Sequence, residues 1–172
     1  FTCGEMPVAL GAEYSSPRLF LLMDVLEHVA DDVSFLERAT SMLDPGDLML
    51  LTVPADMTLW SQHDVSFGHY RRYDIGSLRA TWRGFPLKVE MLSYFNARIY
   101  PIVKSIRFLS RLFAKPWGEA GTDLAVPIAP VNQILERIFA SEVSALLELL
   151  DGQRRRGYRF GVSLLAVLRA VA

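Results

Sequence analysis

The sequence predicts an α/β domain built on a mostly parallel sheet with helices on both faces, an arrangement called doubly wound. Two short apolar runs, LFLLM and LMLLTVP, are typical of strands buried on both faces, and an amphipathic segment with helical spacing separates them. A strand, a helix and a strand in this order form a parallel pair joined by a right-handed crossover. The length of 172 residues, 51% of them hydrophobic, fits one domain over residues 1–172.

Local signals place the first elements along the chain. Residues 1–18 contain scattered glycines and prolines, which predicts a lead-in without regular structure. Asp31 or Asp32 is expected to cap the helix between the two strands, and DPGD ends it because proline cannot continue a helix. Asp74 is expected to cap a short helix that runs to Trp82, and the alternating LKVEMLSYF segment predicts a third strand.

The last part of the chain predicts a helical insertion before the final strand GVSLLAVLRA. The insertion spans residues 97–150 and holds two amphipathic helices joined by a proline-containing stretch, so we expect it to act as a lid. Lys104, Arg107, Arg111 and Lys115 share one face of the first helix. This basic face indicates either a solvated outer surface or peripheral contact with an anionic membrane.

Composition limits the classes of function. With 18 basic and 19 acidic residues the formal net charge is -1, which argues against a chain-wide surface for nucleic acid. Cys3 is the only cysteine, which excludes an internal disulfide and a cysteine-based zinc site and fits a cytoplasmic protein. No apolar run approaches the roughly 18 residues of a membrane span.

Four segments occur in a fixed order: MDVLEHVADD, DPGDLMLLTVP, LWSQHDVSFGHYRRYD and RFGVSLLAVLR. Together they resemble the class I S-adenosylmethionine-dependent methyltransferases, most closely the small bacterial members with a DVLEH segment after the fourth strand. The resemblance starts at Leu19 and implies the carboxyl-terminal part of a Rossmann-like methyltransferase fold. The glycine-rich loop and the acidic residue of the family's amino-terminal half have no counterpart here. We therefore expect the chain to be incomplete, the alternative being a degenerate member without full cofactor binding.

The resemblance implies S-adenosylmethionine as the cofactor and methyl transfer to a small or lipid-linked acceptor. The residues that it places beside the cofactor are Met23, Asp24, Leu26 and His28. Met23 is expected to contact the adenosine part. The alternative is that Met23 belongs to the core, and that Glu27 and His28 organise the turn after the strand.

A long polar and aromatic loop over residues 55–73 follows the second strand and is expected to overhang the pocket. Its histidines are candidates for a general base, its arginines for holding a carboxylate or phosphate, and its aromatic residues for the pocket wall. The candidates are His63 and His69 for catalysis, and Trp60, Tyr70, Arg71 and Arg72 for substrate binding. The alternative is that His–Asp and Arg–Asp pairs tie the loop to its own domain.

No metal site is expected, because the spacing of His63, Asp64 and His69 fits no metal motif. A second hypothesis for the function is a non-catalytic Rossmann-like binding module that docks a partner chain or a membrane surface through the basic helix. An open sheet edge would favour pairing with a second copy of the chain, so a homodimer belongs to this alternative.

Overall fold

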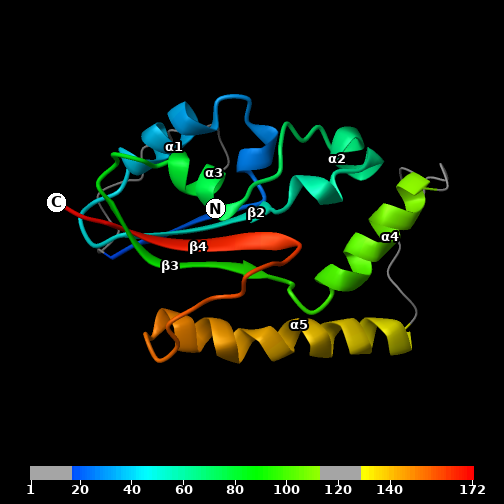
Figure 1. Cartoon of the computed structure of the whole chain (residues 1–172). Helices are drawn as coiled ribbons and strands as arrows, with labels where there is room; N and C mark the ends of the chain where they lie inside the picture. The colour runs from blue at the N-terminus through cyan, green and yellow to red at the C-terminus, as the bar shows by residue number, and fades with distance from the viewer. Residues whose placement is uncertain (1–16, 113–128) are drawn as a thin grey trace.

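The computed structural model describes residues 17–112 and 129–172. The strands are β1 (Leu19–Met23), β2 (Leu48–Pro54), β3 (Leu87–Phe95) and β4 (Ser163–Ala170). The α-helices are α1 (Asp32–Thr40), α2 (Gln62–Ser66), α3 (Ile75–Ala80), α4 (Tyr100–Leu112) and α5 (Ala129–Leu150), with 3-10 helices η1 (Leu26–His28) and η2 (Met57–Leu59). Figure 1 shows α1 and α3 on one side of the sheet, α5 on the other side, and α4 beyond the strand ends. Most of the predicted lead-in, the middle of the predicted insertion, Cys3 and Lys115 lie outside the described residues.

The four strands form one mixed sheet in the order β1-β2-β4-β3. β1 and β2 are parallel, with Leu19 opposite Leu48, whereas β4 is antiparallel to both β2 and β3. The prediction of a mostly parallel sheet is therefore wrong, since one of the three strand pairings is parallel. β4 enters between β2 and β3 and runs opposite to both. β1, β2 and β3 consequently point in one direction, and their carboxyl ends lie at the same edge.

The hydrophobic core lies between the sheet and the side covered by α1 and α3. Its completely buried members include Leu26, Leu36, Met49, Leu51, Leu78, Leu164 and Leu168. Side chains alternate across a strand, so every second residue of β2 and β4 contributes to this core. The predicted strands at these two positions are confirmed.

Both predicted helix caps are found. Asp31 caps α1 and accepts a hydrogen bond from the Ser34 amide at 3.0 Å. Of the two aspartates that the sequence offered as the cap, Asp31 is therefore the one used. The neighbouring Asp32 is buried and instead accepts a hydrogen bond from the Tyr73 hydroxyl at 2.7 Å. Asp74 caps α3 as predicted, but the helix ends at Ala80, before Trp82.

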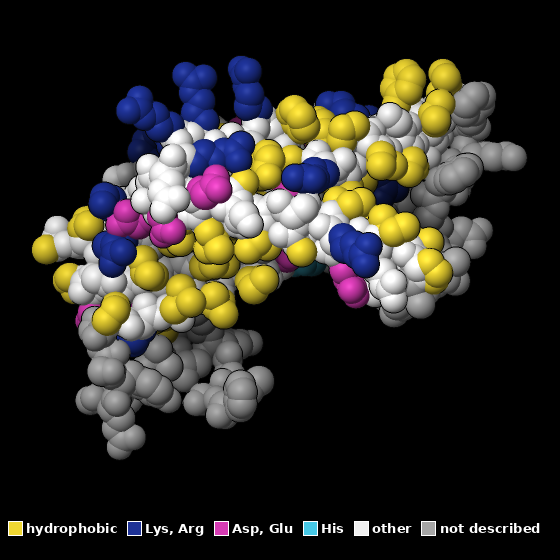
Figure 2. Space-filling view, turned by 90° about the horizontal axis from the view of Figure 1, so that it is seen from below, with side chains coloured by type: hydrophobic (Ala, Val, Ile, Leu, Met, Phe, Trp, Pro, Cys, Tyr) yellow, Lys and Arg dark blue, Asp and Glu magenta, His cyan; other side chains and the backbone are white. Residues whose placement is uncertain are grey.

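β1 is buried on one face only. Leu19, Leu21 and Met23 are 56%, 57% and 59% exposed, so the prediction of a strand buried on both faces is wrong for β1 within the described residues. The helix on this side of the sheet, α5, contacts β3, which lies at the opposite end of the strand order. Figure 2, seen from this side, shows hydrophobic side chains gathered over much of the surface.

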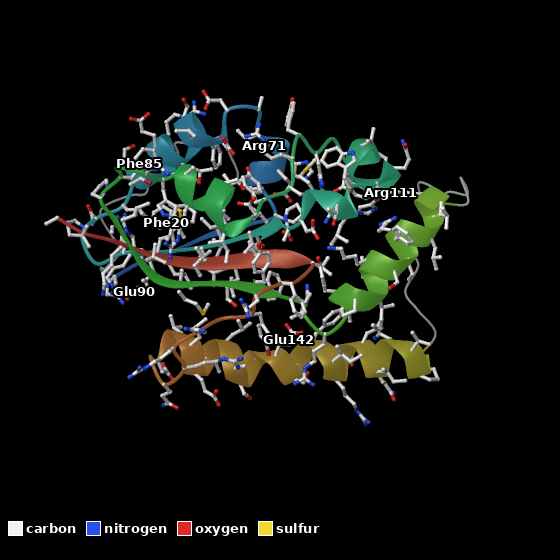
Figure 3. All side chains as sticks on the ribbon, viewed as in Figure 1. Phe20, Arg71, Phe85, Glu90, Arg111 and Glu142 are labelled. Carbon is white, nitrogen blue, oxygen red and sulfur yellow. The ribbon has the colours of Figure 1, made fainter. Side chains whose placement is uncertain are left out.

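Glu142 fixes the start of the insertion to the rest of the fold. This α5 residue is 2% exposed, and its carboxylate accepts hydrogen bonds from the amides of Ala97 and Arg98 at 3.2 and 2.8 Å (Figure 3). α4 itself has no buried residue, and its apolar side chains, among them Ile102 and Leu109, stay largely exposed. Among the described residues, no helix combines the length and the hydrophobicity needed to cross a membrane.

Asp47 joins three parts of the fold at the start of β2. Its carboxylate is completely buried and receives hydrogen bonds from the Arg18 amide, from the Arg18 guanidinium and from the Asp44 amide. Its backbone pairs with Ala170 at the end of β4. Burial acts to raise the pKa of Asp47, but the hydrogen bonds from Arg18 and Asp44 outweigh it and lower the pKa to about 2.

Replacing Asp47 with asparagine should lower the free energy of unfolding by about 2 kcal/mol at neutral pH, because the ion pair with Arg18 is lost. The folded-state pKa lies below the ordinary value of 3.8, so this contribution is complete above that value and disappears as the pH falls towards 2. Urea unfolding followed by circular dichroism should therefore show a difference between wild type and Asp47→Asn that shrinks in acid.

Asp44→Asn is the matched control for this prediction. Asp44 also contacts the Arg18 guanidinium, at 2.7 Å, but its side chain is 69% exposed. Its replacement should change the free energy of unfolding by less than about 1 kcal/mol, as is usual for surface ion pairs. Equal losses for the two variants would contradict the role given to Asp47.

Candidate functional site

Residues with left-handed backbone follow all three strands that point in the same direction. Asp24 comes directly after β1, Asp56 two residues after β2 and Asn96 directly after β3, with φ of 52°, 59° and 55°. In the described part of the chain, every other residue with positive φ is a glycine. Asp and Asn tolerate this conformation better than other side chains, and such strain concentrates at functional sites. The carboxyl edge of the sheet is therefore the candidate site.

On the β1 side, the structure places two of the predicted cofactor residues at this edge. Met23 is more than half exposed, and Asp24 is held against β2, because its amide donates to the Thr52 carbonyl at 3.0 Å and its carboxylate accepts from the Thr52 hydroxyl at 3.2 Å. The side chain of His28 is 41% exposed. Leu26, by contrast, is completely buried in the core, so its side chain offers no surface to a cofactor.

Asp64 organises the loop that follows β2. It is completely buried in α2, and its carboxylate binds the Ser61 amide at 2.9 Å, His69 Nδ1 at 3.1 Å and Arg72 Nε at 2.7 Å. Although burial acts to raise the pKa of Asp64, these hydrogen bonds and the charge of Arg72 lower it. Asp64 therefore stays ionised and holds the two predicted functional residues in place.

The arginines of the loop are engaged within the fold. Arg71 forms an ion pair with Asp32 at 2.7 Å, and its guanidinium donates to the Ala30 carbonyl (Figure 3). Arg72 is paired with Asp64 and donates to the Ala55 carbonyl at 3.1 Å. These contacts are the internal pairs of the alternative interpretation, in which the loop is tied to its own domain. For Arg71 and Arg72, a role in substrate binding stays a prediction.

Two cavities lined by described residues open at the carboxyl edge. The larger, of about 850 Å³, lies between α4, η2 and the segment before β4. We call it the α4 groove, and it is lined by Thr58, Tyr100, Pro101, Lys104, Ser105, Phe108, Leu109, Arg111 and Phe160. The smaller, of about 290 Å³, shares Tyr100 and Phe160 with it and adds Asp56 and Arg72. The larger volume is in the range of small-molecule sites.

Three polar residues meet where the two cavities join. The Tyr100 hydroxyl donates to Asp56 Oδ2 at 2.6 Å and accepts from Lys104 Nζ at 2.6 Å, while Lys104 Nζ lies 3.3 Å from Asp56 Oδ2. Burial opposes ionisation of Asp56, but its bonds to Tyr100, Thr58 and Lys104 lower its pKa to about 2. Burial and the bond to Asp56 raise the pKa of Tyr100, so its hydroxyl keeps its proton. No pattern in the sequence singled out Asp56 or Tyr100, and the only signal for Lys104 was its place on a basic helix face.

The other predicted residues of the loop lie outside the linings of these two cavities. His63 packs against Phe67 with ring centroids 4.4 Å apart, and Tyr70 is 59% exposed. Trp60 is half-buried, and its carbonyl accepts a hydrogen bond at 3.0 Å from Arg111, which reaches over from α4 (Figure 3). Burial lowers the pKa of His69, against the opposing effect of Asp64, so His69 is neutral near physiological pH. Catalytic roles for His63 and His69 stay predictions.

One group of described residues has the composition of a metal site. Glu27, His28 and His69 each place one ligand atom within 4.8 Å of the others. Burial raises the pKa of Glu27 to about 7, and the nearby charge of Asp24 adds to this effect. The metal ligands weighed from the sequence were His63, Asp64 and His69, whereas in the structure His69 lies beside Glu27 and His28.

No protein-family model matches the sequence, and no curated protein matches it. Among solved structures, a chain in the complex between the Haloferax volcanii Trm112 methyltransferase activator and a methyltransferase is 17% identical, with a TM-score of 0.44 over 90% of this chain and 54% of that one. The (4+2)-cyclase SpnF is 13% identical, with a TM-score of 0.44 over 94% of this chain and 54% of that one. The Haemonchus contortus phosphoethanolamine N-methyltransferase 2 in complex with S-adenosyl-L-methionine is 14% identical, with a TM-score of 0.44 over 90% of this chain and 33% of that one.

This chain thus spans 54% or less of the length of these three proteins. Similarity at this level gives no residue a role.

Asp64→Asn should lower the free energy of unfolding by about 3 kcal/mol, because it leaves Arg72, whose side chain is 8% exposed, without its counter-charge. Urea unfolding monitored by circular dichroism measures this loss. Asp74→Asn is the control, since asparagine caps a helix about as well as aspartate, and its effect should stay below about 0.5 kcal/mol. A small effect at Asp64 would show that its contacts do not hold the loop.

Proposed function

We propose that this chain forms part of an S-adenosylmethionine-dependent methyltransferase and that the α4 groove holds a small or lipid-linked methyl acceptor. One observation carries the proposal. The groove opens at the edge where the carboxyl ends of β1, β2 and β3 lie, which is where α/β sheets bind their ligands. Its lining comes from the segments after β2 and β3 and from the segment before β4. Two of the segments that resemble class I methyltransferases, MDVLEHVADD and LWSQHDVSFGHYRRYD, follow the carboxyl ends of β1 and β2.

The chemistry of the groove favours an acceptor with one polar and one apolar part. Phe108, Leu109 and Phe160 supply apolar wall, and Tyr100 with Lys104 supplies a polar end. The hydrogen bond from Lys104 to Tyr100 raises the pKa of Lys104, so the ammonium stays charged. A hydroxyl or an anionic group of an acceptor would find donors at this end, while an alkyl or aromatic part would cover the apolar wall.

The described residues fit one end of the cofactor. S-adenosylmethionine supplies a methyl group on a positively charged sulfur. Met23 presents an exposed thioether at the carboxyl end of β1, a surface on which an adenine ring can pack, and Asp24 offers a carboxylate beside it. Leu26 does not fit, because it is buried.

The polar cluster at the groove positions the acceptor rather than removing its proton. Asp56, with its pKa near 2, is a weak base, and the Tyr100 hydroxyl is already committed to it. Methyl transfer is an in-line displacement, in which alignment and exclusion of water supply most of the acceleration. Where an acceptor has to lose a proton, His63 and the neutral imidazole of His69 stay the candidates of the loop.

The binding-module hypothesis has one specific observation in its favour. The face of β1 formed by Leu19, Leu21 and Met23 is open, and so is much of the apolar side of α4. Exposed apolar surface of this kind is typical of contacts with another chain or with lipid. This hypothesis differs from the methyltransferase proposal because it requires no cofactor.

Isothermal titration calorimetry of this chain with S-adenosylhomocysteine, the product form of the cofactor, distinguishes the methyltransferase proposal from the binding-module hypothesis. The methyltransferase proposal expects saturable binding that Met23→Glu weakens at least about tenfold, because a charge replaces the apolar contact. Leu19→Glu is the matched control, as it lies on the same open face at the other end of β1 and should leave the affinity unchanged. Equal losses for both variants would contradict the contact given to Met23. Lack of binding would mean that the glycine-rich half is indispensable and absent, which leaves a fragment or the binding module.

The groove can be tested through the acceptor. In the protein with its complete cofactor site, Phe108→Ser should raise KM for an acceptor with an apolar chain by about tenfold or more, since burying a large apolar side chain is worth about 1.5–3 kcal/mol. A panel of hydroxyl and amine acceptors with and without an alkyl chain provides the assay. Leu112→Ser on the same helix, which is also exposed but does not line the groove, should leave KM unchanged. An unchanged KM in Phe108→Ser would place the acceptor elsewhere.

A further inference from the structure

Side chains from two distant segments form a compact cluster with metal-ligand chemistry. Glu27 and His28 lie in η1, just after β1, and His69 lies in the loop after α2. The rings of the two histidines meet edge to face with centroids 4.6 Å apart, and His28 Nε2 lies 4.0 Å from Glu27 Oε1. One ligand atom from each of the three residues lies within 4.8 Å of the others. Two imidazoles and one carboxylate are a donor set that binds zinc and similar divalent ions.

The surroundings of Glu27 indicate that its carboxylate needs a positively charged partner. It is 1% exposed, and its Oε2 atom has no hydrogen-bond partner among residues 17–112 and 129–172. The other buried carboxylates of these ranges are all partnered: Asp32 by Arg71, Asp47 by Arg18, Asp64 by Arg72, and Glu142 by two backbone amides. A buried carboxylate oxygen without a partner is costly, and a bound cation would remove that cost.

His69 is already oriented as a ligand. Its Nδ1 atom is bonded to the buried carboxylate of Asp64 at 3.1 Å, which leaves Nε2 as the nitrogen with a free lone pair. Histidine ligands of metals commonly have such a carboxylate on the second ring nitrogen, because it fixes the tautomer and the ring orientation. The backbone supports the arrangement, since the Tyr70 amide donates to the Glu27 carbonyl at 2.7 Å and so joins the two segments.

The charges around the cluster are compatible with a cation. Arg72, a neighbouring positive charge, is neutralised by its ion pair with Asp64 at 2.7 Å. Asp24 adds a negative charge close enough to act on Glu27. His28 is 41% exposed, whereas His69 is 11% exposed, so the cluster is open to solvent on the His28 side and closed behind. An ion can therefore enter without local unfolding.

We propose that Glu27, His28 and His69 bind a divalent cation of the zinc class, with Asp64 orienting His69. This site goes beyond the proposed methyl transfer and does not depend on it. Three protein ligands leave at least one coordination position, which water or an oxygen of a substrate would fill. The ion would also link η1 to the loop after α2.

Equilibrium dialysis of the chain, prepared without a histidine tag, against Zn²⁺ tests the site. We expect saturable binding of about one ion per chain, and an affinity that falls at least about tenfold in His28→Ala and in His69→Ala. Glu27→Gln keeps the size of the buried side chain while removing its charge, and should lose affinity to a similar extent. The Tm of the wild type should rise on addition of Zn²⁺, and that of His28→Ala should not.

His63→Ala is the matched control, because His63 lies in the same loop region but outside the cluster, and this variant should bind Zn²⁺ like the wild type. The proposal is overturned if the wild type shows no saturable binding, or if the His28, His69 and Glu27 variants all bind as the wild type does. A decrease in His63→Ala equal to that in His28→Ala would likewise overturn it. The experiment measures metal binding in the absence of cofactor. A failure of the metal-site proposal is therefore distinguishable from a failure of the chain to bind S-adenosylhomocysteine.

Discussion

The backbone hydrogen bonds of β4 are the interaction on which the rest of the structure depends. β4 pairs along its length with β2 on one side and β3 on the other, from Ser163 to Ala170. It thereby connects the β1–β2 unit to β3, which α5 covers. Because β4 runs opposite to both neighbours, β2 and β3 point the same way, and the chain between them crosses one face of the sheet through α3 (Figure 1). The common direction brings the carboxyl ends of β1, β2 and β3 to one edge.

This shared edge explains why the unusual backbone and the polar clusters occur together. Each of the three strands is followed, directly or after one residue, by a residue with left-handed backbone: Asp24, Asp56 or Asn96. Asp56 then reaches Tyr100 on the helix that follows β3, while the segment after β1 meets the loop after α2 at the Glu27 carbonyl. The α4 groove and the Glu27–His28–His69 cluster are therefore two parts of one edge.

Local signals predicted the elements well, and non-local contacts account for what they did not predict. The caps at Asp31 and Asp74 and the apolar runs of β1, β2 and β4 depend on neighbouring residues, and the structure contains all of them. The direction of β4 could not be predicted, since an apolar run records burial but not orientation. The open face of β1 depends on which helices cover it. Tyr100 is 44 residues from Asp56, and no spacing rule joins them.

Asp64 is in contact with residues from both parts of the edge. Its carboxylate holds Arg72, which lines the smaller cavity beside the α4 groove, and also His69, which belongs to the metal-type cluster. A cation bound by His69 would withdraw electron density from the imidazole and strengthen its bond to Asp64. The Asp64 carboxylate would then interact more strongly with His69 than with Arg72. Occupation of the cluster would in this way reach the smaller cavity through one buried carboxylate.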